Sequence, residues 1–500
     1  MNYLSTRGST SGFSAAAAIK EGMAADGGLF VPSCIPCPGP TFVSGLAPLS
    51  YGERAAKVLS LFLDDYTAEE IAGSVQAAYG KGKFDHPAVA PLVAIDGGTA
   101  MLELWHGPTS AFKDMALQLL PQLLSLALAK TGETSEIVIL VATSGDTGKA
   151  ALEGFRDVAG TRIVVFYPHE GVSAIQQLQM ATQEGGNVAV VAVRGNFDDA
   201  QTGVKNIFND RQATEELAAL GFKLSSANSI NWGRLLPQIV YYFSAYADMV
   251  KAGRVRDGQA VNFVVPTGNF GNILAGYYAK LMGLPVGRLI CASNANNVLS
   301  EFLRTGVYDR RRTFHKTLSP SMDILISSNL ERLLYHAGGG DAAQVAAWMD
   351  QLAGEGRYQV TGKPLAVIQE TFWSDWASDQ ETTAAIKEIF AACRYLADPH
   401  TAVAWHVCQA YRQASGDRTP TVIVSTASPF KFNEGVVAAL AGPGALDGQS
   451  EFAALRQLSR LSGWPVPPAL ADLEQKSVRH TSVCDKEAMY AMVKQALAVK

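Results

Sequence analysis

Short runs of apolar residues alternate with helix-length amphipathic stretches over most of the chain. The apolar runs are rich in β-branched residues and cover 136–144, 162–168, 187–195, 260–268, 284–293 and 420–428. Runs of this length, bounded by Gly, Pro and polar residues, are typical of buried strands. Their alternation with helices predicts an α/β fold with largely parallel sheets, in which ligands bind beyond the carboxyl ends of the strands.

This pattern changes along the chain and predicts four regions. Residues 1–98 join short helical stretches through Gly/Pro-rich connections, which indicates a helical N-terminal region. Residues 99–260 and 261–440 are predicted to form two α/β domains with a cleft between them. Residues 441–500 predict a C-terminal helical segment. Within the first α/β domain, one helix is expected from about residue 111 to residue 130.

Composition and charge favour a soluble protein that acts on small molecules. The 500 residues are 48% hydrophobic and 17% charged, and the formal net charge is -5. No block of like charges is present, so neither nucleic acid nor a membrane surface is expected as a partner. The start shows no secretory signal, and the most apolar stretch, 115–129, is too short to span a bilayer. A cytoplasmic location is expected, and the oligomeric state is left open.

The six cysteines predict no disulfide framework in a chain of this length. Cys34 and Cys37 have the CxxC spacing of a redox pair or of half a zinc site. No second pair of ligands accompanies them, and prolines surround them. No metal site is therefore predicted, and the role of the two cysteines stays open.

The stretch "GPTSAFKDM", residues 107–115, places a lone lysine where a helix begins. Lysine is disfavoured there because the helix dipole puts partial positive charge at the N-terminus. A lysine held in that field beside Phe112 loses its proton more readily than one in water. Lys113 is therefore either a solvated surface residue or a candidate nucleophile that forms a Schiff base.

Three loops that follow predicted strands carry further candidate chemistry. In "VATSGDTGKAALEGF", hydroxyls and backbone N–H groups converge at a helix start and predict an anion site. The spacing excludes a nucleotide-binding P-loop, because Thr143 stands where the first glycine is needed and Ala150 follows the lysine. In "VVPTGNFGN", two glycines and a helix start predict a phosphate cradle without the dinucleotide fingerprint. In "VIVSTASPFKF", Thr426 can direct a hydroxyl into the same crevice.

A lysine that loses its proton readily, a phosphate cradle and an anion-binding loop are together the parts of a site that holds pyridoxal phosphate. The chain resembles the threonine synthase family, specifically its longer bacterial and fungal branch, which has the tryptophan-synthase-β fold (fold type II of these enzymes). Nearly the whole chain takes part, and the motifs occur in order. They are "MNYLSTRG", "AADGGLFVP", "HGPTSAFKD", "ATSGDTGKAA", "NSINWGRLLPQ", "PTGNFGN", "DPHTAVAWH" and "STASPFKF".

The resemblance implies a role for each cofactor-binding residue. Lys113 is the Schiff-base lysine, and Thr426 lies against the pyridine nitrogen. Asp146 lies near the 3′ oxygen of the cofactor, where shorter relatives carry Asn, so one of the two groups must be protonated or the contact is not made. The cofactor phosphate is held by Gly268, Asn269, Phe270, Gly271 and Asn272.

The resemblance also implies a lyase that converts O-phospho-L-homoserine and water to L-threonine and phosphate, the last step of threonine biosynthesis. The reaction is a γ-elimination followed by β-addition of water. The substrate carboxylate is assigned to the loop of Ser144, Gly145, Asp146 and Thr147. Substrate-phosphate binding is assigned to Arg234 and Ser229, with Thr147 and Asn272 nearby. Lys149 is either a further cation for this phosphate or a solvated surface lysine.

Three other functions compete with this prediction. Threonine dehydratase and cysteine synthase share the lysine and both loops but are expected to have several consecutive glycines in the cradle, where this chain has "GNFGN". A kinase or ATPase is disfavoured by the failed P-loop spacing. A non-enzymatic binding protein on the same fold is expected to lack the lysine or the phosphate loop, and both are present.

Overall fold

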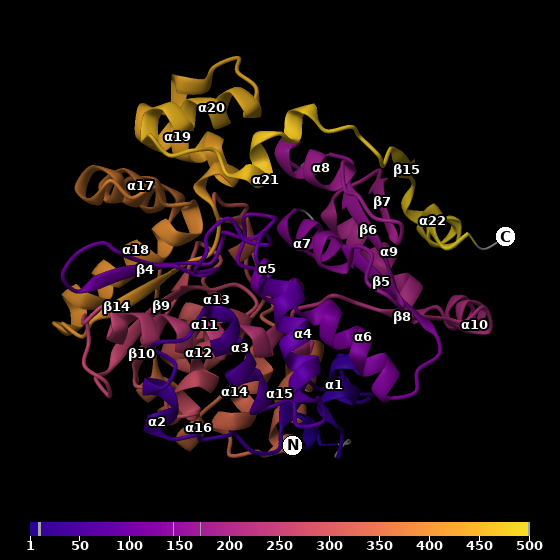
Figure 1. Ribbon diagram of the computed structural model, residues 1–500, viewed down its shortest axis with the longest axis horizontal. Helices are drawn as coiled ribbons and strands as arrows, with labels where there is room; N and C mark the ends of the chain where they lie inside the picture. The colour runs from indigo at the N-terminus through magenta and orange to yellow at the C-terminus, as the bar shows by residue number, and fades with distance from the viewer. Residues whose placement is uncertain (9–11, 144, 171, 499–500) are drawn as a thin grey trace.

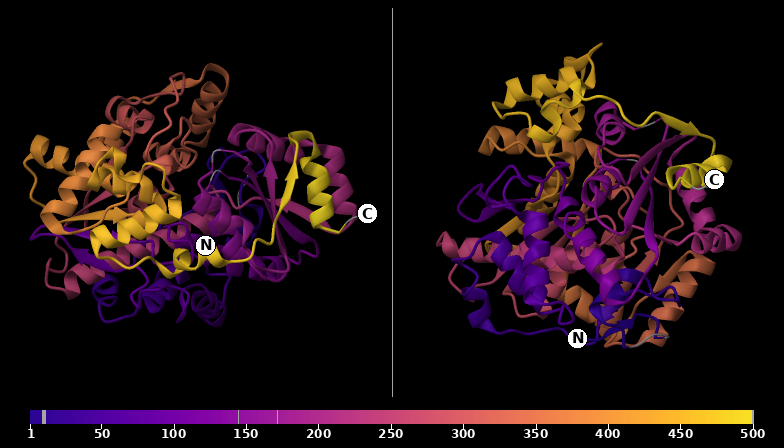
Figure 2. Two further views of the ribbon diagram at one scale, coloured as in Figure 1. Left: turned by 90° about the horizontal axis from the view of Figure 1, so that it is seen from above. Right: turned by 45° about the vertical axis from the view of Figure 1, so that its right-hand side comes forward.

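The computed structural model describes residues 1–8, 12–143, 145–170 and 172–498. Within this part of the chain, two principal sheets of five and six strands form the centres of two lobes that lie side by side (Figures 1 and 2). All six strands predicted from the apolar runs are present, within a few residues of the expected bounds. The predicted α/β fold with largely parallel sheets is therefore confirmed.

The five-stranded sheet is entirely parallel, and its three central strands are largely buried. Its order is β15 (Ser482–Cys484), β7 (Val188–Val193), β6 (Thr161–Pro168), β5 (Glu136–Ala142) and β8 (Phe222–Ser225). Helices α9 (Phe197–Asn209) and α22 (Met489–Ala496) cover one face, and α7 (Asp146–Phe155) contacts the sheet at β6. Alternate residues such as Val138 and Ile139 belong to different apolar clusters, as expected for a strand with a period of two.

The six-stranded sheet is parallel except for its last strand. Its order is β13 (Phe372–Trp376), β10 (Val286–Ser293), β9 (Val261–Pro266), β14 (Thr421–Ser425), β4 (Thr99–Glu103) and the antiparallel β3 (Leu92–Ala94). Helix α18 (Pro399–Ser415) packs on this sheet and shares one cluster with Val264 and Ile290. Helix α12 (Gly271–Leu281) shares the other cluster with Phe263 and Leu289. Both faces are therefore covered.

The chain crosses between the lobes more often than the predicted boundaries allow. Strand β4 pairs with β14 and with β3, so residues 92–94 and 99–103 belong to the sheet whose other four strands come after residue 260. The C-terminal segment also crosses over, and its strand β15 extends the five-stranded sheet next to β7 (Figure 2, left). The predicted division at residues 99, 261 and 441 stays a prediction, but hydrogen bonds between distant strands do not follow it.

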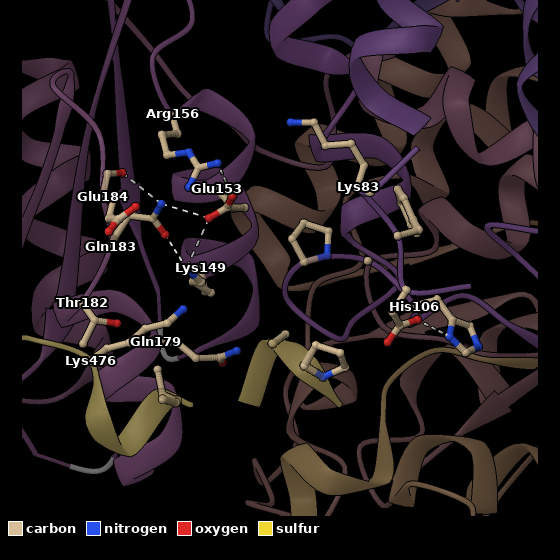
Figure 3. Close-up of a pocket in the computed structure, with 18 of the residues that line it drawn as sticks. Lys83, His106, Lys149, Glu153, Arg156, Gln179, Thr182, Gln183, Glu184 and Lys476 are labelled. Carbon is tan, nitrogen blue, oxygen red and sulfur yellow. Dashed lines mark hydrogen bonds and ion pairs between the residues drawn. The ribbon is translucent and has the colours of Figure 1, made fainter. Parts of the chain in front are cut away.

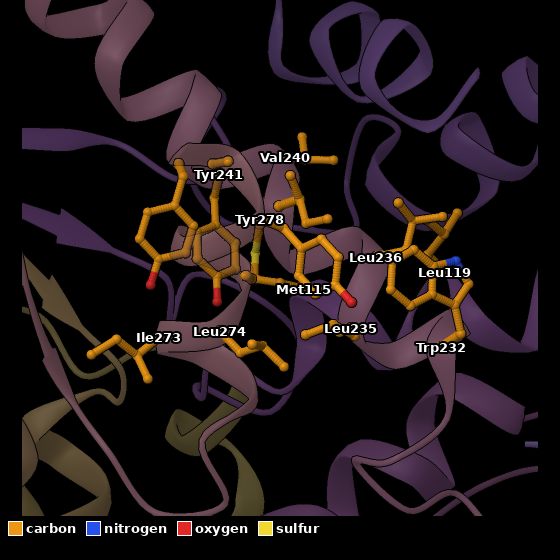
Figure 4. Packing of buried hydrophobic residues seen from close by; sticks show 14 of the residues in the cluster. Met115, Leu119, Trp232, Leu235, Leu236, Val240, Tyr241, Ile273, Leu274 and Tyr278 are labelled. Atoms are coloured by element: carbon orange, nitrogen blue, oxygen red, sulfur yellow. The ribbon is translucent and has the colours of Figure 1, made fainter. Parts of the chain in front are cut away.

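The N-terminal region packs under both lobes. It contains β1 (Tyr3–Ser5), β2 (Phe30–Pro32), α1 (Ala15–Glu21), α2 (Pro40–Ser44), α3 (Tyr51–Ser60) and α4 (Ala68–Tyr79). Helix α3 contacts the long buried helix α11 (Trp232–Lys251), which also packs against α12. Figure 4 shows Trp232, Leu236 and Tyr278 in the apolar cluster that joins these helices.

The continuous helix predicted over residues 111–130 is wrong. The chain forms two helices there, α5 (Asp114–Leu117) and α6 (Leu120–Lys130). Pro121 lies in the first turn of α6, where its missing N–H costs no hydrogen bond. Helix α7 packs closely against the break, since a Cβ on Gly154 would lie 1.9 Å from the carbonyl oxygen of Leu117. The chain therefore breaks between α5 and α6 where it contacts α7, and the apolar pattern alone did not indicate this contact.

The remaining helices cover the edges of the lobes. They are α8 (Ala174–Ala181), α10 (Arg211–Ala219), α13 (Val298–Thr305), α14 (Leu330–Ala337), α15 (Ala342–Glu355), α16 (Gly362–Thr371), α17 (Asp379–Cys393), α19 (Asn433–Ala441), α20 (Glu451–Ser462) and α21 (Pro468–Ala471). A small antiparallel pair joins β11 (Val307–Asp309) and β12 (Arg357–Gln359). Among the helices of the described residues, none is long and apolar enough to cross a membrane.

Candidate active site

Lys113 immediately precedes α5, at the end of a loop whose shape depends on Asp114. The buried Asp114 carboxylate accepts hydrogen bonds from the Thr109 backbone N–H at 2.8 Å and from the Thr109 hydroxyl at 2.7 Å. Gly107 leaves room for it, since a Cβ there would lie 2.5 Å from Asp114 Oδ2. An antiparallel bridge between Ala111 and Ala427 joins this loop to the segment after β14. The backbone around Lys113 is therefore fixed from both sides.

The Lys113 amine is surrounded by protein, and only 13% of the side chain is exposed. Its Nζ donates a hydrogen bond to Ser321 Oγ at 3.3 Å and lies 3.8 Å from Asp146 Oδ2. Burial lowers the pKa of Lys113 to about 8 against the opposing charge of Asp146. The charges of Lys431 and Arg234 lower it further. The neutral amine, which is the form that attacks a carbonyl carbon or accepts a proton, is therefore accessible near neutral pH.

Asp146 lies between two lysines at the start of α7. Its Oδ1 is 2.5 Å from the fully buried Nζ of Lys431, which also donates to the carbonyl oxygen of Thr109 at 2.9 Å. Although burial raises the pKa of Asp146, the charges of Lys431 and Lys113 hold it well below its usual range. The carboxylate is therefore ionised, and Lys431 compensates its charge in the protein interior.

Sequence reasoning missed Lys431, although a signal was present. "SPFKF" places Lys431 between two phenylalanines shortly after a strand, as "AFKDM" places Lys113 after Phe112. Only the fold brings the two lysines together, because β14 and the Lys113 loop are joined by the bridge at Ala111.

The loop 268–272 links β9 to α12 and has the geometry of an anion cradle. Phe270 is buried and has a φ of 63°, a left-handed conformation that turns the chain sharply into the helix. At Gly268, a Cβ would lie 2.6 Å from the carbonyl oxygen of Ser321, so a side chain is excluded. No side-chain hydrogen bond caps α12, whose first N–H groups have no partners within the helix. These donors and the helix dipole favour a phosphate group at this end.

Asn272 supplies a further donor at the start of α12. Its Oδ1 accepts hydrogen bonds from Tyr241 Oη at 2.6 Å and Tyr242 Oη at 2.9 Å, which orients the amide. Its Nδ2 is buried and has no hydrogen-bond partner in the described part of the chain. A buried donor without a partner is costly, and an anion at this position satisfies it.

The loop at the start of α7 is built around Thr143. Its Oγ1 accepts hydrogen bonds from the backbone N–H groups of Gly145 and Gly148, both at 3.0 Å. A Cβ on Gly148 would lie 2.2 Å from Thr143 Cγ2, so this turn requires glycine there. Thr147 is half-buried in the first turn of the helix. Ser144, which sequence reasoning assigns to the substrate carboxylate, lies outside the described residues.

Arg234 is buried, which rules out the surface arginine that the sequence alone left open. Its Nη1 donates to the carbonyl oxygen of Ala227 at 2.7 Å, while its Nε is buried without a partner among the described residues. Burial lowers its pKa to about 10, so the guanidinium stays charged at neutral pH. Its charge also lowers the pKa of Lys113. Ser229 is half-buried in the loop before α11.

Arg332 joins this loop to the phosphate cradle, and sequence reasoning missed it. The side chain is fully buried and donates to Phe30 O at 2.9 Å, Asn329 Oδ1 at 2.6 Å and Ile230 O at 2.6 Å. Asn329 in turn donates its backbone N–H to Asn269 O at 3.2 Å. One guanidinium therefore connects the N-terminal region, the loop before α11 and the loop before α12.

Thr426 and His400 lie on the other side of the Lys113 loop. Thr426 is buried, and its carbonyl oxygen accepts a hydrogen bond from the Phe112 N–H at 2.8 Å. His400 Nε2 accepts a hydrogen bond from the Ser321 N–H at 3.2 Å, and its Nδ1 lies 2.7 Å from Asp398 Oδ1. Asp398 thereby orients the imidazole that positions Ser321, the hydrogen-bond partner of Lys113.

Lys149 does not join this group of residues. Its Nζ donates to the Gln183 amide oxygen and lies 3.5 Å from Glu153 Oε2, so it faces α8. Cys34 and Cys37 are exposed free cysteines. Among the described residues, no group of His, Cys, Asp or Glu could hold a metal ion.

Comparison with family models divides the chain into three matching regions. Residues 2–79 match "Threonine synthase N terminus", residues 89–371 match "Pyridoxal-phosphate dependent enzyme", and residues 401–496 match "Threonine synthase, C-terminal". The middle match contains Lys113 and the 268–272 loop.

Characterised relatives are similar over most of the chain. Threonine synthase of Pseudomonas aeruginosa is 41% identical over 437 residues, which cover 87% of this chain and 90% of that protein. Human threonine synthase-like 1 is 42% identical over 434 residues, which cover 85% of this chain and 57% of that protein. The chain therefore spans little more than half the length of this human relative.

Solved structures have the same fold along the entire chain. The structure of threonine synthase from Brucella melitensis with pyridoxal phosphate bound is 39% identical, with a TM-score of 0.88 and 99% of each chain covered. Threonine synthase from yeast is 34% identical, with a TM-score of 0.88 and the same coverage. With its buried lysine, its phosphate cradle and these matches, the chain belongs to the threonine synthase family of pyridoxal-phosphate-dependent enzymes.

Proposed function

We propose that the protein is a threonine synthase, a lyase that converts O-phospho-L-homoserine and water to L-threonine and inorganic phosphate with pyridoxal phosphate as cofactor. The observation that carries this proposal is the buried Lys113 amine beside Asp146, with a pKa lowered to about 8. Family membership and the full-length match to a cofactor-bound threonine synthase support it. The cytoplasmic location stays a prediction of the sequence.

The residues present fit the cofactor. Lys113 would hold it through its amine, and the loop of Gly268, Asn269, Phe270, Gly271 and Asn272 would bind its phosphate. The unpartnered Asn272 Nδ2 and the uncapped start of α12 support this assignment. Thr426 would lie against the pyridine nitrogen. A hydroxyl there would stabilise a protonated ring less than a carboxylate does, so the ring would withdraw electrons less strongly.

Asp146 acts in the site as an ionised group held between Lys113 and Lys431. Shorter relatives carry a neutral Asn at this position, which needs no partner, whereas a buried carboxylate needs a cation. Lys431 Nζ, 2.5 Å from Asp146 Oδ1, supplies that charge. A cofactor oxygen near this pair meets an ammonium group as well as a carboxylate. We therefore propose that Lys431 supplies the positive charge that a carboxylate at position 146 requires.

Substrate binding falls to the loops at the starts of α7 and α11. The carboxylate of the substrate binds at the start of α7, beside Gly145 and with the Thr147 hydroxyl as a donor, and the assignment of Ser144 stays a prediction. Its phosphate binds Arg234, with Ser229, Thr147 and Asn272 as further donors. The buried, unpartnered Nε of Arg234 supports this assignment, because a guanidinium binds phosphate through two parallel hydrogen bonds. Lys149 faces away from these groups, and we do not assign it to the substrate phosphate.

The chain's own residues carry the proton transfers. Bound pyridoxal phosphate supplies an electron sink for a carbanion at the substrate Cα. The neutral Lys113 amine removes the Cα proton, and it is also placed to remove a proton from Cβ and to return one to Cα. Arg234 holds the leaving phosphate as its bond to Cγ breaks. Overall, Cγ becomes a methyl group and the oxygen of water bonds to Cβ.

Two measurements test this proposal. The purified enzyme should release phosphate and form threonine from O-phospho-L-homoserine. Reduction with borohydride followed by digestion and mass spectrometry should find the cofactor on the peptide that contains "AFKDM". Cofactor on another lysine, or on none, contradicts the Lys113 assignment. Release of ammonia and a 2-oxo acid without threonine would point instead to a dehydratase on the same fold.

A further inference from the structure

A second polar cavity lies between the two lobes, and we call it the α7–α8 pocket. It is bounded by α7, by α8, and by the segments 82–85, 106–108 and 468–479, and its volume is about 780 Å³. Figure 3 shows Lys149, Gln179 and Lys476 along one wall, facing Lys83 and His106 across the opening. Cavities of this size hold small molecules in other proteins.

The α7–α8 pocket is separate from the candidate active site. Among the described residues, none of those proposed above to bind cofactor or substrate lines it. Helix α7 contributes to both sites. Asp146 at its start faces Lys113, whereas Lys149, Glu153 and Arg156 farther along line the pocket.

Positive charge exceeds negative charge along the pocket walls. Glu153 is shared by two cations, Lys149 at 3.5 Å and Arg156 at 3.3 Å. Lys83 and Lys476 have no carboxylate partner in the described part of the chain. The pocket therefore holds cations that its own carboxylates do not balance.

Other charges around the pocket are already paired. Arg479 lies 3.2 Å from Glu184. His106 contacts Asp85 at 2.6 Å and Glu103 at 2.8 Å, and these two acids raise the pKa of His106 to about 9 against the effect of burial. His106 is thus a fixed cation with its own partners. The unbalanced charge is concentrated at Lys83, Lys149 and Lys476.

Gln179 points independently to a ligand. It is 1% exposed, lines the pocket, and has neither a donor nor an acceptor partner for its amide among the described residues. A buried amide without partners is costly, because both its oxygen and its nitrogen have lost water. A polar ligand in the pocket restores these hydrogen bonds.

The pKa of Lys149 is also set by opposing effects. Burial lowers the pKa of Lys149 to about 8 against the attraction of Glu153, and the charge of Lys476 lowers it further. The Lys149 and Lys476 ammonium groups therefore repel each other, and the attraction of Glu153 and Asp114 offsets burial and this repulsion only in part. An anion between them stabilises both charges.

We propose that the α7–α8 pocket binds a small anion that carries a phosphate group, with Lys149 and Lys476 on the phosphate, Gln179 as a hydrogen-bonding amide and Lys83 closing the opposite wall. Phosphate suits this arrangement because a compact dianion can contact two ammonium groups and an amide at once. The group can come from inorganic phosphate or from a phosphate monoester. Because this proposal uses none of the assigned active-site residues, it stands independently of the proposed function.

Site-resolved acetylation of lysines tests the proposal with the full-length holoenzyme. The protein is acetylated briefly at pH 8, with increasing inorganic phosphate in one series and O-phospho-L-serine in the other. Mass spectrometry then gives the extent of labelling at each lysine. Labelling of Lys476, Lys149 and Lys83 should fall several-fold, whereas labelling of the exposed Lys251 should stay constant. Protection by only one of the two probes identifies the source of the phosphate group.

Two variants and a matched control make the result specific. Lys476→Gln should raise the concentration for half-protection of Lys83 and Lys149 about tenfold, because a charged hydrogen bond is lost. Gln179→Leu keeps the size of the side chain and should also weaken protection, while Lys251→Gln should leave it unchanged. Constant labelling of all three pocket lysines with both probes overturns the proposal. Protection that is equally strong in Lys476→Gln and Gln179→Leu also overturns it.

Discussion

Two lysines, Lys113 before α5 and Lys149 at the start of α7, have similar burial and ion pairing but different neighbours. Lys113 lies 3.8 Å from Asp146, and Lys149 lies 3.5 Å from Glu153. Each side chain is 13% exposed, and burial lowers the pKa of each to about 8. Burial, pairing and pKa therefore do not distinguish the proposed nucleophile from the other lysine.

The two lysines differ in the hydrogen-bond and ion-pair partners of their amines. Lys149 donates to the Gln183 amide oxygen and shares Glu153 with Arg156, so its ammonium is engaged on the α8 side. Lys113 has only the Ser321 hydroxyl as a hydrogen-bond partner among the described residues, and Lys431 contacts the other oxygen of Asp146 at a shorter distance. A lowered pKa indicates a nucleophilic lysine only when the neutral amine also remains available to a reactant.

The largest expected effect is the loss of Lys113. Lys113→Ala should lower kcat by about 10²–10⁴-fold or more, because no neighbouring group replaces the amine as proton carrier. Cofactor binding should survive through the 268–272 loop, without a covalent bond to the protein. Steady-state kinetics and the visible spectrum measure both effects. Lys113→Arg is the matched variant and should not recover activity, since a guanidinium keeps its proton at neutral pH. Activity in either variant would contradict the assignment of Lys113 as the proton carrier.

The next-largest effect is expected at Lys431, whose charge compensates that of Asp146 in the candidate active site. Lys431→Met leaves the Asp146 carboxylate buried beside Lys113 alone, and should lower the free energy of unfolding by about 3–5 kcal/mol. The double variant Asp146→Asn with Lys431→Met removes both charges and should recover most of that loss. Urea unfolding of the wild type, of the single variants Lys431→Met and Asp146→Asn, and of the double variant gives the coupling between the residues. Additive losses in the double variant would mean that Lys431 does not compensate Asp146.

Arg234 should affect substrate binding more than cofactor binding. Arg234→Ala removes a charged hydrogen bond to the substrate phosphate, worth about 1.5–3 kcal/mol, so KM should rise about ten- to hundredfold. It should also raise the pKa of Lys113, since the Arg234 charge now lowers it. Kinetics with O-phospho-L-homoserine measures the first effect. A normal KM with a normal cofactor spectrum would contradict the assignment of Arg234 to the substrate phosphate.

The smallest effect is a pH dependence of cofactor attachment. The pKa of Lys113 is lowered to about 8, so its ammonium form predominates below pH 8 and its neutral form above it. Because only the neutral amine attacks an aldehyde, the rate of covalent attachment to cofactor-free protein should rise about tenfold between pH 6 and pH 7. The rate should level off above pH 8. Stopped-flow absorbance measures the rate, and a rise that continues to pH 10 would indicate an ordinary lysine.

Local patterns were sufficient to predict six strands of the two principal sheets. Val, Ile and Phe in short runs identified β5, β6, β7, β9, β10 and β14 within a few residues. Strand β15 and the break between α5 and α6 were not predicted. Both depend on partners far away in the chain, β7 and α7 respectively, and their local sequence carries no signal for those partners.

The sequence by itself determined the α/β fold, the candidate Lys113, and the two loops at helix starts, because strand periodicity and backbone turns are encoded by neighbouring residues. Only the tertiary structure decided which charges meet. Lys431 reaches Asp146 from a segment 285 residues later, Arg332 joins three distant loops, and Lys149 turns toward α8. Coulomb interactions and desolvation depend on distance in space, so the pKa of Lys113 and the unbalanced charge of the α7–α8 pocket follow from the fold.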